Sequence, residues 1–74
     1  MRLTDCYAKK RVACRRVEVL PDGRRRTTWE PGRVSSTNAT YIFVRLDTQV
    51  ARLGWEAAPS QVCVPGDVFE LDDL

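Results

Sequence analysis

The chain has no histidine, and its three cysteines, Cys6, Cys14 and Cys63, contain no C-x-x-C pair. Without histidine, a cysteine or serine nucleophile lacks its most common activating base. An odd number of widely spaced cysteines also argues against a disulfide framework or a zinc site. We therefore expect no metal and no cofactor, and we expect the thiols to be buried as small apolar side chains.

Long apolar runs and internal carboxylate pairs are missing as well. No stretch approaches the ~18 apolar residues of a membrane span, and the segment Met1–Asp5 lacks the apolar centre of a signal peptide. The one adjacent carboxylate pair, Asp72-Asp73, falls at the end of the sequence, and the four glycines stand singly rather than in a phosphate loop. These absences predict a cytoplasmic protein that is not an enzyme, with no catalytic residues, no membrane contact and no evident small-molecule substrate.

What is present is an ordinary globular composition, with 43% hydrophobic and 30% charged residues in a chain of 74. This length is near the lower limit for one self-sufficient core, so we expect a single domain with a stability of only a few kcal/mol. We divide it into an N-terminal arm (1–9), a β-barrel (10–71) and an acidic C-terminal tail (72–74).

The first half of the sequence predicts a hairpin. Arg11–Leu20 is rich in valine and ends at Pro21-Asp22-Gly23, a combination that favours a tight turn, before a returning strand over Arg24–Glu30. Within the first strand the phase slips, because Val12 and Cys14 share one face whereas Val17 and Val19 fall on the other. A one-residue bulge around Arg15-Arg16 would restore a common inward face.

The middle of the chain predicts a further strand. Pro31-Gly32 is expected to break or bend the returning strand, and a turn around Asn38 precedes Tyr41–Leu46, the segment of highest β propensity. Alternation along this segment places one set of side chains in the core, namely Ile42, Val44 and Leu46. The opposite set faces outward and consists of Tyr41, Phe43 and Arg45.

The last third is less regular. Val50–Glu56 is expected to be a short strand or an irregular loop, and Gln61–Val64 a strand with Val62 and Val64 inward. Pro65-Gly66-Asp67 predicts a short 3₁₀ turn before a final strand over Val68–Leu71. The expected fold is therefore all-β, a single small antiparallel barrel of about five strands.

Two segments carry a family resemblance. The run Trp29-Glu30-Pro31-Gly32-Arg33-Val34, followed by Tyr41-Ile42-Phe43-Val44-Arg45-Leu46-Asp47, resembles the central hairpin of SH3-like barrels of the Tudor and KOW type. Val64–Leu71 is similar to their closing 3₁₀ turn and last strand. The resemblance covers roughly residues 10–71 and implies a fold rather than a function.

A thinner similarity links Ser60-Gln61-Val62-Cys63-Val64-Pro65 to the active-site strand of type II dihydrofolate reductase, another SH3-like barrel. Gln61 matches that strand, but Cys63 stands where the family has a tyrosine. A reductase is therefore a remote alternative.

Charge divides the sequence into unequal halves. Residues 1–34 hold ten Lys and Arg against four Asp and Glu, a net charge of +6, whereas residues 35–74 hold two against six, a net charge of −4. If the predicted hairpin forms, its basic residues lie on one ribbon that could follow a phosphate backbone. These residues are Lys9, Lys10, Arg11, Arg15, Arg16, Arg24, Arg25 and Arg26.

The sequence therefore favours a non-enzymatic binding module, of a kind we expect to be encoded by a phage or mobile element, that binds nucleic acid through the basic hairpin. The alternative is an acidic protein partner or a second copy of the chain. A self-associating or protein-binding face would use exposed aromatic and arginine side chains, for which the candidates are Trp29, Tyr41, Phe43 and Arg45.

Overall fold

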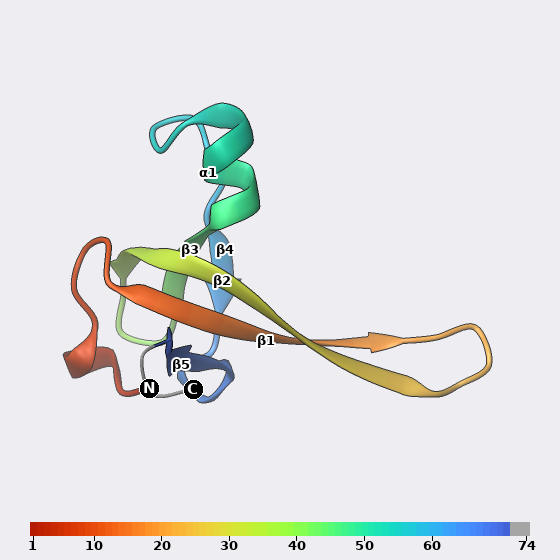
Figure 1. Cartoon of the computed structure of the whole chain (residues 1–74). Helices are drawn as coiled ribbons and strands as arrows, with labels where there is room; N and C mark the ends of the chain where they lie inside the picture. Colours follow the sequence, from red (N-terminus) through yellow and green to blue (C-terminus); the bar gives the residue numbers. More distant parts are fainter. Residues whose placement is uncertain (72–74) are drawn as a thin grey trace.

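The computed structural model describes residues 1–71, and the acidic tail expected at 72–74 lies outside this range. Five strands form one antiparallel sheet in the order β4-β3-β2-β1-β5 (Figure 1). The elements in chain order are η1 (Leu3–Asp5), β1 (Arg11–Val19), β2 (Arg25–Thr37), β3 (Ile42–Leu46), α1 (Asp47–Leu53), β4 (Gln61–Cys63), η2 (Pro65–Asp67) and β5 (Val68–Glu70). The predicted all-β class, the five strands and the 3₁₀ turn before the last strand are confirmed.

A small core of β-branched side chains lies on the inner face of the sheet. Four strands contribute to it, and its fully buried members are Val12, Val34, Ile42, Val44 and Val68. Each such side chain contributes roughly 1.5–3 kcal/mol when it leaves water. Strand β3 follows the predicted alternation, because Ile42, Val44 and Leu46 are all buried.

The predicted hairpin forms between β1 and β2, which pair along all of β1 from Arg11 opposite Arg33 to Val19 opposite Arg25. At the turn, the Leu20 N–H donates to the Arg24 carbonyl (2.7 Å), and the Asp22 carboxylate accepts from the Arg24 N–H (3.0 Å). Gly23 has a φ of 86°, which glycine adopts without a steric penalty. The sequence Pro21-Asp22-Gly23 therefore predicted the position of this turn correctly.

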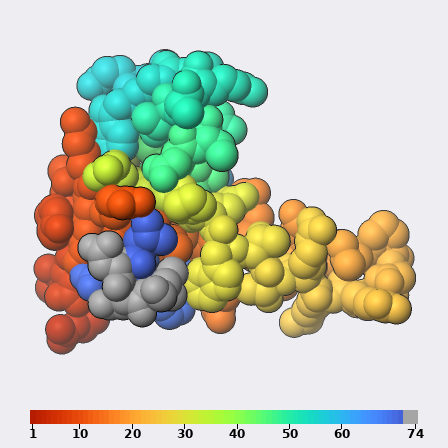
Figure 2. Space-filling view, in the orientation of Figure 1, coloured from red at the N-terminus to blue at the C-terminus, as the bar shows by residue number. Residues whose placement is uncertain are grey.

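Beyond Cys14 the hairpin leaves the core and projects from the rest of the molecule (Figures 1 and 2). The predicted bulge at Arg15-Arg16 is wrong, since the β1–β2 register runs without a shift. The one register shift in this part of the sheet lies between Val34 and Ser36, where β2 pairs with β3. A projecting hairpin has no inner face to fill, so Val17 and Val19 need not turn inward.

Of the two outcomes expected at Pro31-Gly32, a break or a bend, the break is wrong, because β2 continues through both residues. Gly32 instead permits close packing against β3. A Cβ atom at this position would lie 2.7 Å from the Arg45 carbonyl oxygen and 2.8 Å from Val44 Cγ1. Only a residue without a side chain allows the two strands to approach in this way.

The segment expected to be a strand or loop over Val50–Glu56 is helical in its first four residues, because α1 extends from Asp47 to Leu53, and irregular in its last three. Asp47 in the first turn and Arg52 in the last turn both suit the helix dipole, and Gly54 ends the helix with a φ of 84°. Seven residues make only two turns, too few to show a helical period in the sequence. Within residues 1–71 no helix has the length and apolar content needed to cross a membrane.

The inward assignment of Val62 and Val64 is wrong. Their exposed fractions are 61% and 46%. In the β3–β4 register, Cys63 lies opposite the buried Ile42, and Val62 opposite Phe43, so Cys63 is the inward residue. A shift of one residue in a strand exchanges its two faces. Because β4 has only three residues and an apolar side chain on each face, its sequence does not show which face is buried.

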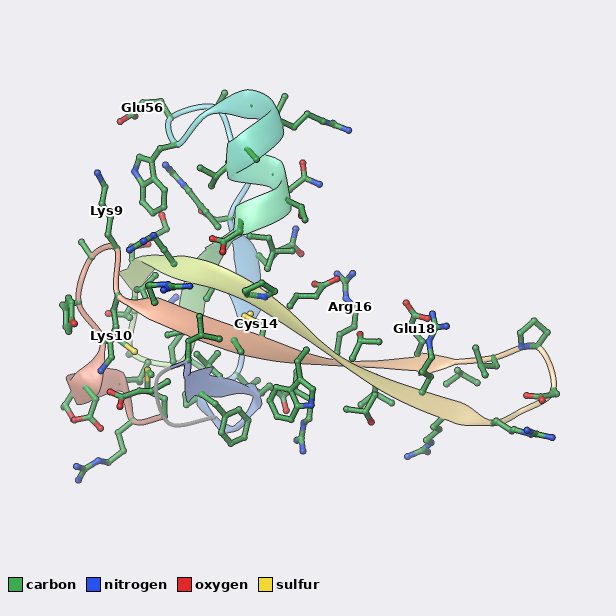
Figure 3. The ribbon with its side chains drawn as sticks, in the orientation of Figure 1. Lys9, Lys10, Cys14, Arg16, Glu18 and Glu56 are labelled. Carbon is green, nitrogen blue, oxygen red and sulfur yellow. The ribbon has the colours of Figure 1, made fainter. Side chains whose placement is uncertain are left out.

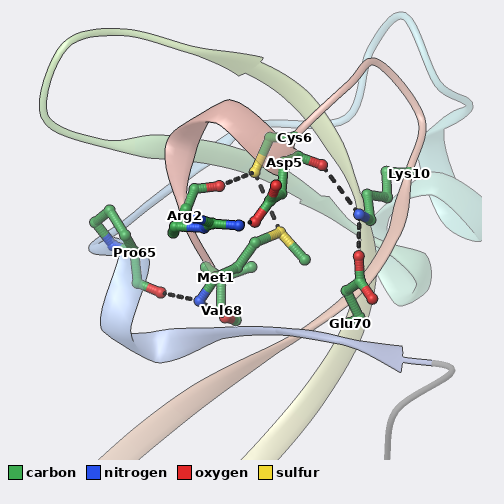
Figure 4. A network of polar contacts seen from close by, with 8 residues as sticks. All are labelled: Met1, Arg2, Asp5, Cys6, Lys10, Pro65, Val68 and Glu70. Atoms are coloured by element: carbon green, nitrogen blue, oxygen red, sulfur yellow. Dashed lines mark hydrogen bonds and ion pairs between the residues drawn. The ribbon is translucent and has the colours of Figure 1, made fainter.

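The first ten residues are held against the sheet by polar contacts that Figure 4 shows. The amino group of Met1 donates to the carbonyls of Pro65 (2.9 Å) and Val68 (2.8 Å). Met1, Leu3 and Cys6 pack at the edge of the core. Lys10 forms an ion pair with Glu70 of β5. The segment predicted as an arm therefore covers one end of the core.

The close packing of Gly32 against β3 predicts that a side chain at this position destabilises the fold. Replacing Gly32 with alanine should lower the free energy of unfolding by about 1–3 kcal/mol, because the new methyl group overlaps backbone and side chain of β3. Urea denaturation measures the change. Gly66→Ala is the control, since a Cβ there meets no atom within 4 Å, and an equal loss in both variants would contradict the argument.

Candidate binding surfaces

The predicted basic residues lie along the β1–β2 hairpin in three groups. Lys9, Lys10 and Arg11 lie where β1 begins, beside the core, whereas Arg24–Arg26 lie at the tip of the hairpin (Figure 3 labels Lys9 and Lys10 at one end). At about 3.3 Å per residue, β1 alone puts roughly 26 Å between them. Arg15 and Arg16 lie between these two ends, in the middle of β1, so the eight residues are spread along the hairpin. We call Arg24, Arg25 and Arg26 the tip cluster.

Most of the hairpin arginines face a carboxylate. Arg26 lies 2.6 Å from Glu18, Arg24 lies 3.1 Å from Asp22, and Arg16 lies 3.3 Å from Glu30. Arg15 reaches Asp67 of η2 at 2.7 Å. Solvent-exposed pairs of this kind contribute about 0–1 kcal/mol, so a ligand phosphate or carboxylate can replace the protein carboxylate at little cost.

The two faces of the hairpin differ in chemistry. Opposite residues share a face, so Arg16 and Glu18 lie with Arg26 and Glu30 on a charged face. The other face carries Arg15 and Arg25 together with three exposed apolar side chains, with exposed fractions of 51% for Val17, 72% for Val19 and 46% for Trp29. We call Val17, Val19 and Trp29 the apolar hairpin face.

Trp29 is anchored at the base of this apolar hairpin face. Its ring meets the ring of Phe69 edge to face, with 5.0 Å between the centroids. Phe69 belongs to β5, on the far side of β1 from β3. Trp29 is therefore a surface residue, and the structure does not bring it together with Phe43 and Arg45 of β3.

The rest of the predicted partner face is partly covered. Tyr41 is 39% exposed, but Phe43 and Arg45 are half-buried. The Arg45 guanidinium stacks 4.7 Å from the centre of the Trp55 ring and donates to the Trp55 carbonyl. Trp55 follows α1, so this helix brings a tryptophan over a strand face that the sequence alone predicts to be open.

A hollow of about 600 Å³ lies at the core end of the hairpin, where Lys9, Lys10 and Arg11 meet Tyr7 and Arg33. Lys10 is engaged by Glu70, and this hydrogen bond raises the pKa of Lys10 above its ordinary value. The Lys10 ammonium also lies 5.2 Å from the Tyr7 ring centre. The sequence did not indicate Tyr7 and Arg33 as members of this group. Arg33 joins it because the β1–β2 register places Arg33 opposite Arg11.

Two thiols meet at a second, smaller cavity of about 210 Å³ between β1 and β4. The sulfur atoms of Cys14 and Cys63 lie 3.4 Å apart. Over residues 1–71 no three His, Cys, Asp or Glu side chains form a group able to hold a metal ion.

Comparison with protein-family models, with curated proteins and with solved structures found no significant match to this chain.

The contact between Arg45 and Trp55 predicts a measurable stabilisation. Arg45→Met keeps the volume of the side chain but removes the cation over the ring and the charged hydrogen bond, so it should lower the free energy of unfolding by about 1–3 kcal/mol. Tryptophan fluorescence in the background Trp29→Phe, which leaves Trp55 as the sole tryptophan, reports both the stability and the ring environment. Unchanged stability and emission would contradict a role for this contact. Arg52→Met, on an exposed residue of α1, is the control.

Proposed function

We propose that this chain is a non-enzymatic binding module and that its projecting β1–β2 hairpin binds nucleic acid. One observation carries the proposal, namely that a two-stranded ribbon extends past the core with the three exposed arginines of the tip cluster at its end. The major groove of duplex DNA is about 12 Å wide and admits a two-stranded β-ribbon.

The charge of the hairpin supports an anionic ligand. Residues 15–30 contain five arginines and three acidic residues, which leaves a net charge of +2. Of the tip cluster, the Arg24 and Arg26 side chains are 81% and 59% exposed despite their ion pairs. Phosphates that displace Asp22 and Glu18 exchange one weak exposed pair for another and release counterions from the nucleic acid.

Trp29 adds a second element to this proposal. It is nearly half exposed and lies directly opposite Arg15 in the hairpin. An exposed ring beside an arginine can stack an unpaired base, as single-strand-binding proteins do. Single strands are therefore included among the ligands to be tested.

A protein partner, including a second copy of the chain, is the second candidate. The apolar hairpin face favours it, because Val17 and Val19 gain from removal of their exposed surface from water. The affinity of such an interface should not change with salt concentration, whereas the affinity for phosphates should fall as the salt concentration rises.

The SH3-like identity of the fold and a cytoplasmic location are part of the same proposal. In support of the former, η2 precedes β5 as the family resemblance implies, and β5 pairs with β1.

Fluorescence anisotropy with single- and double-stranded DNA and RNA tests the function. Changing Arg24, Arg25 and Arg26 together to glutamine should lower the affinity at least about tenfold at low salt. If the tip cluster neutralises three phosphates, the change should also reduce the slope of log K against log salt by about three for duplex DNA. Glu18→Gln with Asp22→Asn, which frees Arg26 and Arg24 from their carboxylates, should raise the affinity.

The control variant changes Lys9, Arg11 and Arg33 at the other end of β1 to glutamine, and it should have the smaller effect. Absence of binding at low salt would refute the nucleic-acid proposal. Self-association that light scattering detects at high salt, and that Val17→Thr with Val19→Thr abolishes, would establish the protein-interaction candidate in its place.

A further inference from the structure

Cys14 and Cys63 are far apart in the chain and in the strand order, yet their sulfur atoms are in contact. Cys14 lies in β1 and Cys63 in β4, two strands that are separated by β2 and β3 in the sheet. The 3.4 Å between their Sγ atoms shows that the sheet curls until β4 approaches β1.

The pair has one protected and one accessible member. Cys14 is buried, with an exposed fraction of 6%, whereas Cys63 is half-buried. Both line the cavity of about 210 Å³, whose rim includes Arg15, Arg16 and Asp67. A small reagent can therefore reach Cys63 from solvent, with Cys14 positioned directly behind it.

We propose that Cys14 and Cys63 form an oxidisable dithiol, which closes to a disulfide in exchange with a low-molecular-weight disulfide such as oxidised glutathione. The bond would tie β1 to β4 across the open side of the curled sheet. This modification site uses no residue of the tip cluster, and the argument for it does not depend on the ligand proposed for the hairpin.

The exchange takes place in two balanced steps. The Cys63 thiolate attacks one sulfur of the small disulfide, which forms a mixed disulfide and expels the first small thiolate. Cys14 then loses its proton to solvent and attacks the Cys63 sulfur, which forms the Cys14–Cys63 bond and expels the second small thiolate. The protein loses two protons and two electrons, and the small disulfide is reduced to two thiols.

The environment of each thiol sets the order of attack. The hydrogen bond from Cys14 stabilises the Cys63 thiolate and lowers the pKa of Cys63, whereas that hydrogen bond and burial raise the pKa of Cys14. The thiolate is the attacking form, so Cys63 reacts first and Cys14 resolves the mixed disulfide. Cys6 is excluded from the pair because its sulfur contacts Met1 Sδ (3.2 Å) in the N-terminal segment.

Closing the bond should stabilise the fold. The two cysteines are 49 positions apart, so the cross-link removes a large part of the freedom of the unfolded chain. For a domain of this size the expected rise in melting temperature is roughly 10–20 °C. The disulfide should stabilise the position of β4 most directly, because β4 lies at the sheet edge and pairs only with β3, over three residues.

The test treats the folded, reduced chain with oxidised glutathione and then blocks the remaining thiols. Trypsin places the three cysteines on separate peptides, which cover residues 3–9, 12–15 and 53–74. Mass spectrometry should find peptide 12–15 joined to peptide 53–74, with Cys6 still alkylated. The oxidised sample should melt at the higher temperature, and a small-molecule dithiol should reverse both results.

Two matched variants keep the test decisive. Cys6→Ala should form the bond like the unaltered chain, and Cys63→Ala should show no linked peptide and no rise in melting temperature. A mixed disulfide that persists on Cys63, a link through Cys6, or a link between two chains would overturn the proposal. The peptide map of the unaltered chain gives the result even if Cys63→Ala fails to fold.

Discussion

The packing of a few β-branched side chains on the inner face of the sheet is the interaction on which the rest of the structure depends. Val12, Val34, Ile42, Val44 and Val68 come from four strands and exclude water almost completely. They cover only a short length of β1, however, since its buried stretch ends at Cys14. A domain of this size can bury only a small core, and the outer part of β1 and β2 extends past it into solvent.

The surface that this leaves uncovered combines charge and apolar area in a way that either kind of partner could use. Along one face, arginines and carboxylates of the same hairpin pair with each other, which keeps the ribbon soluble and limits its net charge. Along the other, Val17 and Val19 remain exposed. Ion pairs in solvent exchange readily, so they leave the tip arginines available to a stronger anion. Elsewhere on the sheet, Trp55 covers Arg45, on a strand face that the sequence alone predicts to be open.

Curling of the sheet has a consequence of its own. It brings β4 against β1 and places two thiols in contact, one exposed enough to react and one buried behind it. The dithiol lies at the boundary between the core and the hairpin, with Arg15 and Arg16 at its rim. Oxidation would therefore strengthen the core next to the point where the hairpin leaves it, without using any residue of the tip cluster.

The sequence by itself determined the features that depend on neighbouring residues. These are the Pro21-Asp22-Gly23 turn, the alternation of Tyr41–Leu46 and the 3₁₀ turn at Pro65, because turn torsions and a period of two are local properties. Tertiary structure decided the rest. The phase of β4 came from pairing Cys63 with Ile42, the two-turn helix α1 was too short to show a period, and the bulge lies where β2 meets β3. Of the site, the sequence identified the arginines, but only the length of β1 decided how far apart they lie, and only the curl of the sheet joined Cys14 to Cys63. Contacts across tens of residues depend on strand register and not on local preference.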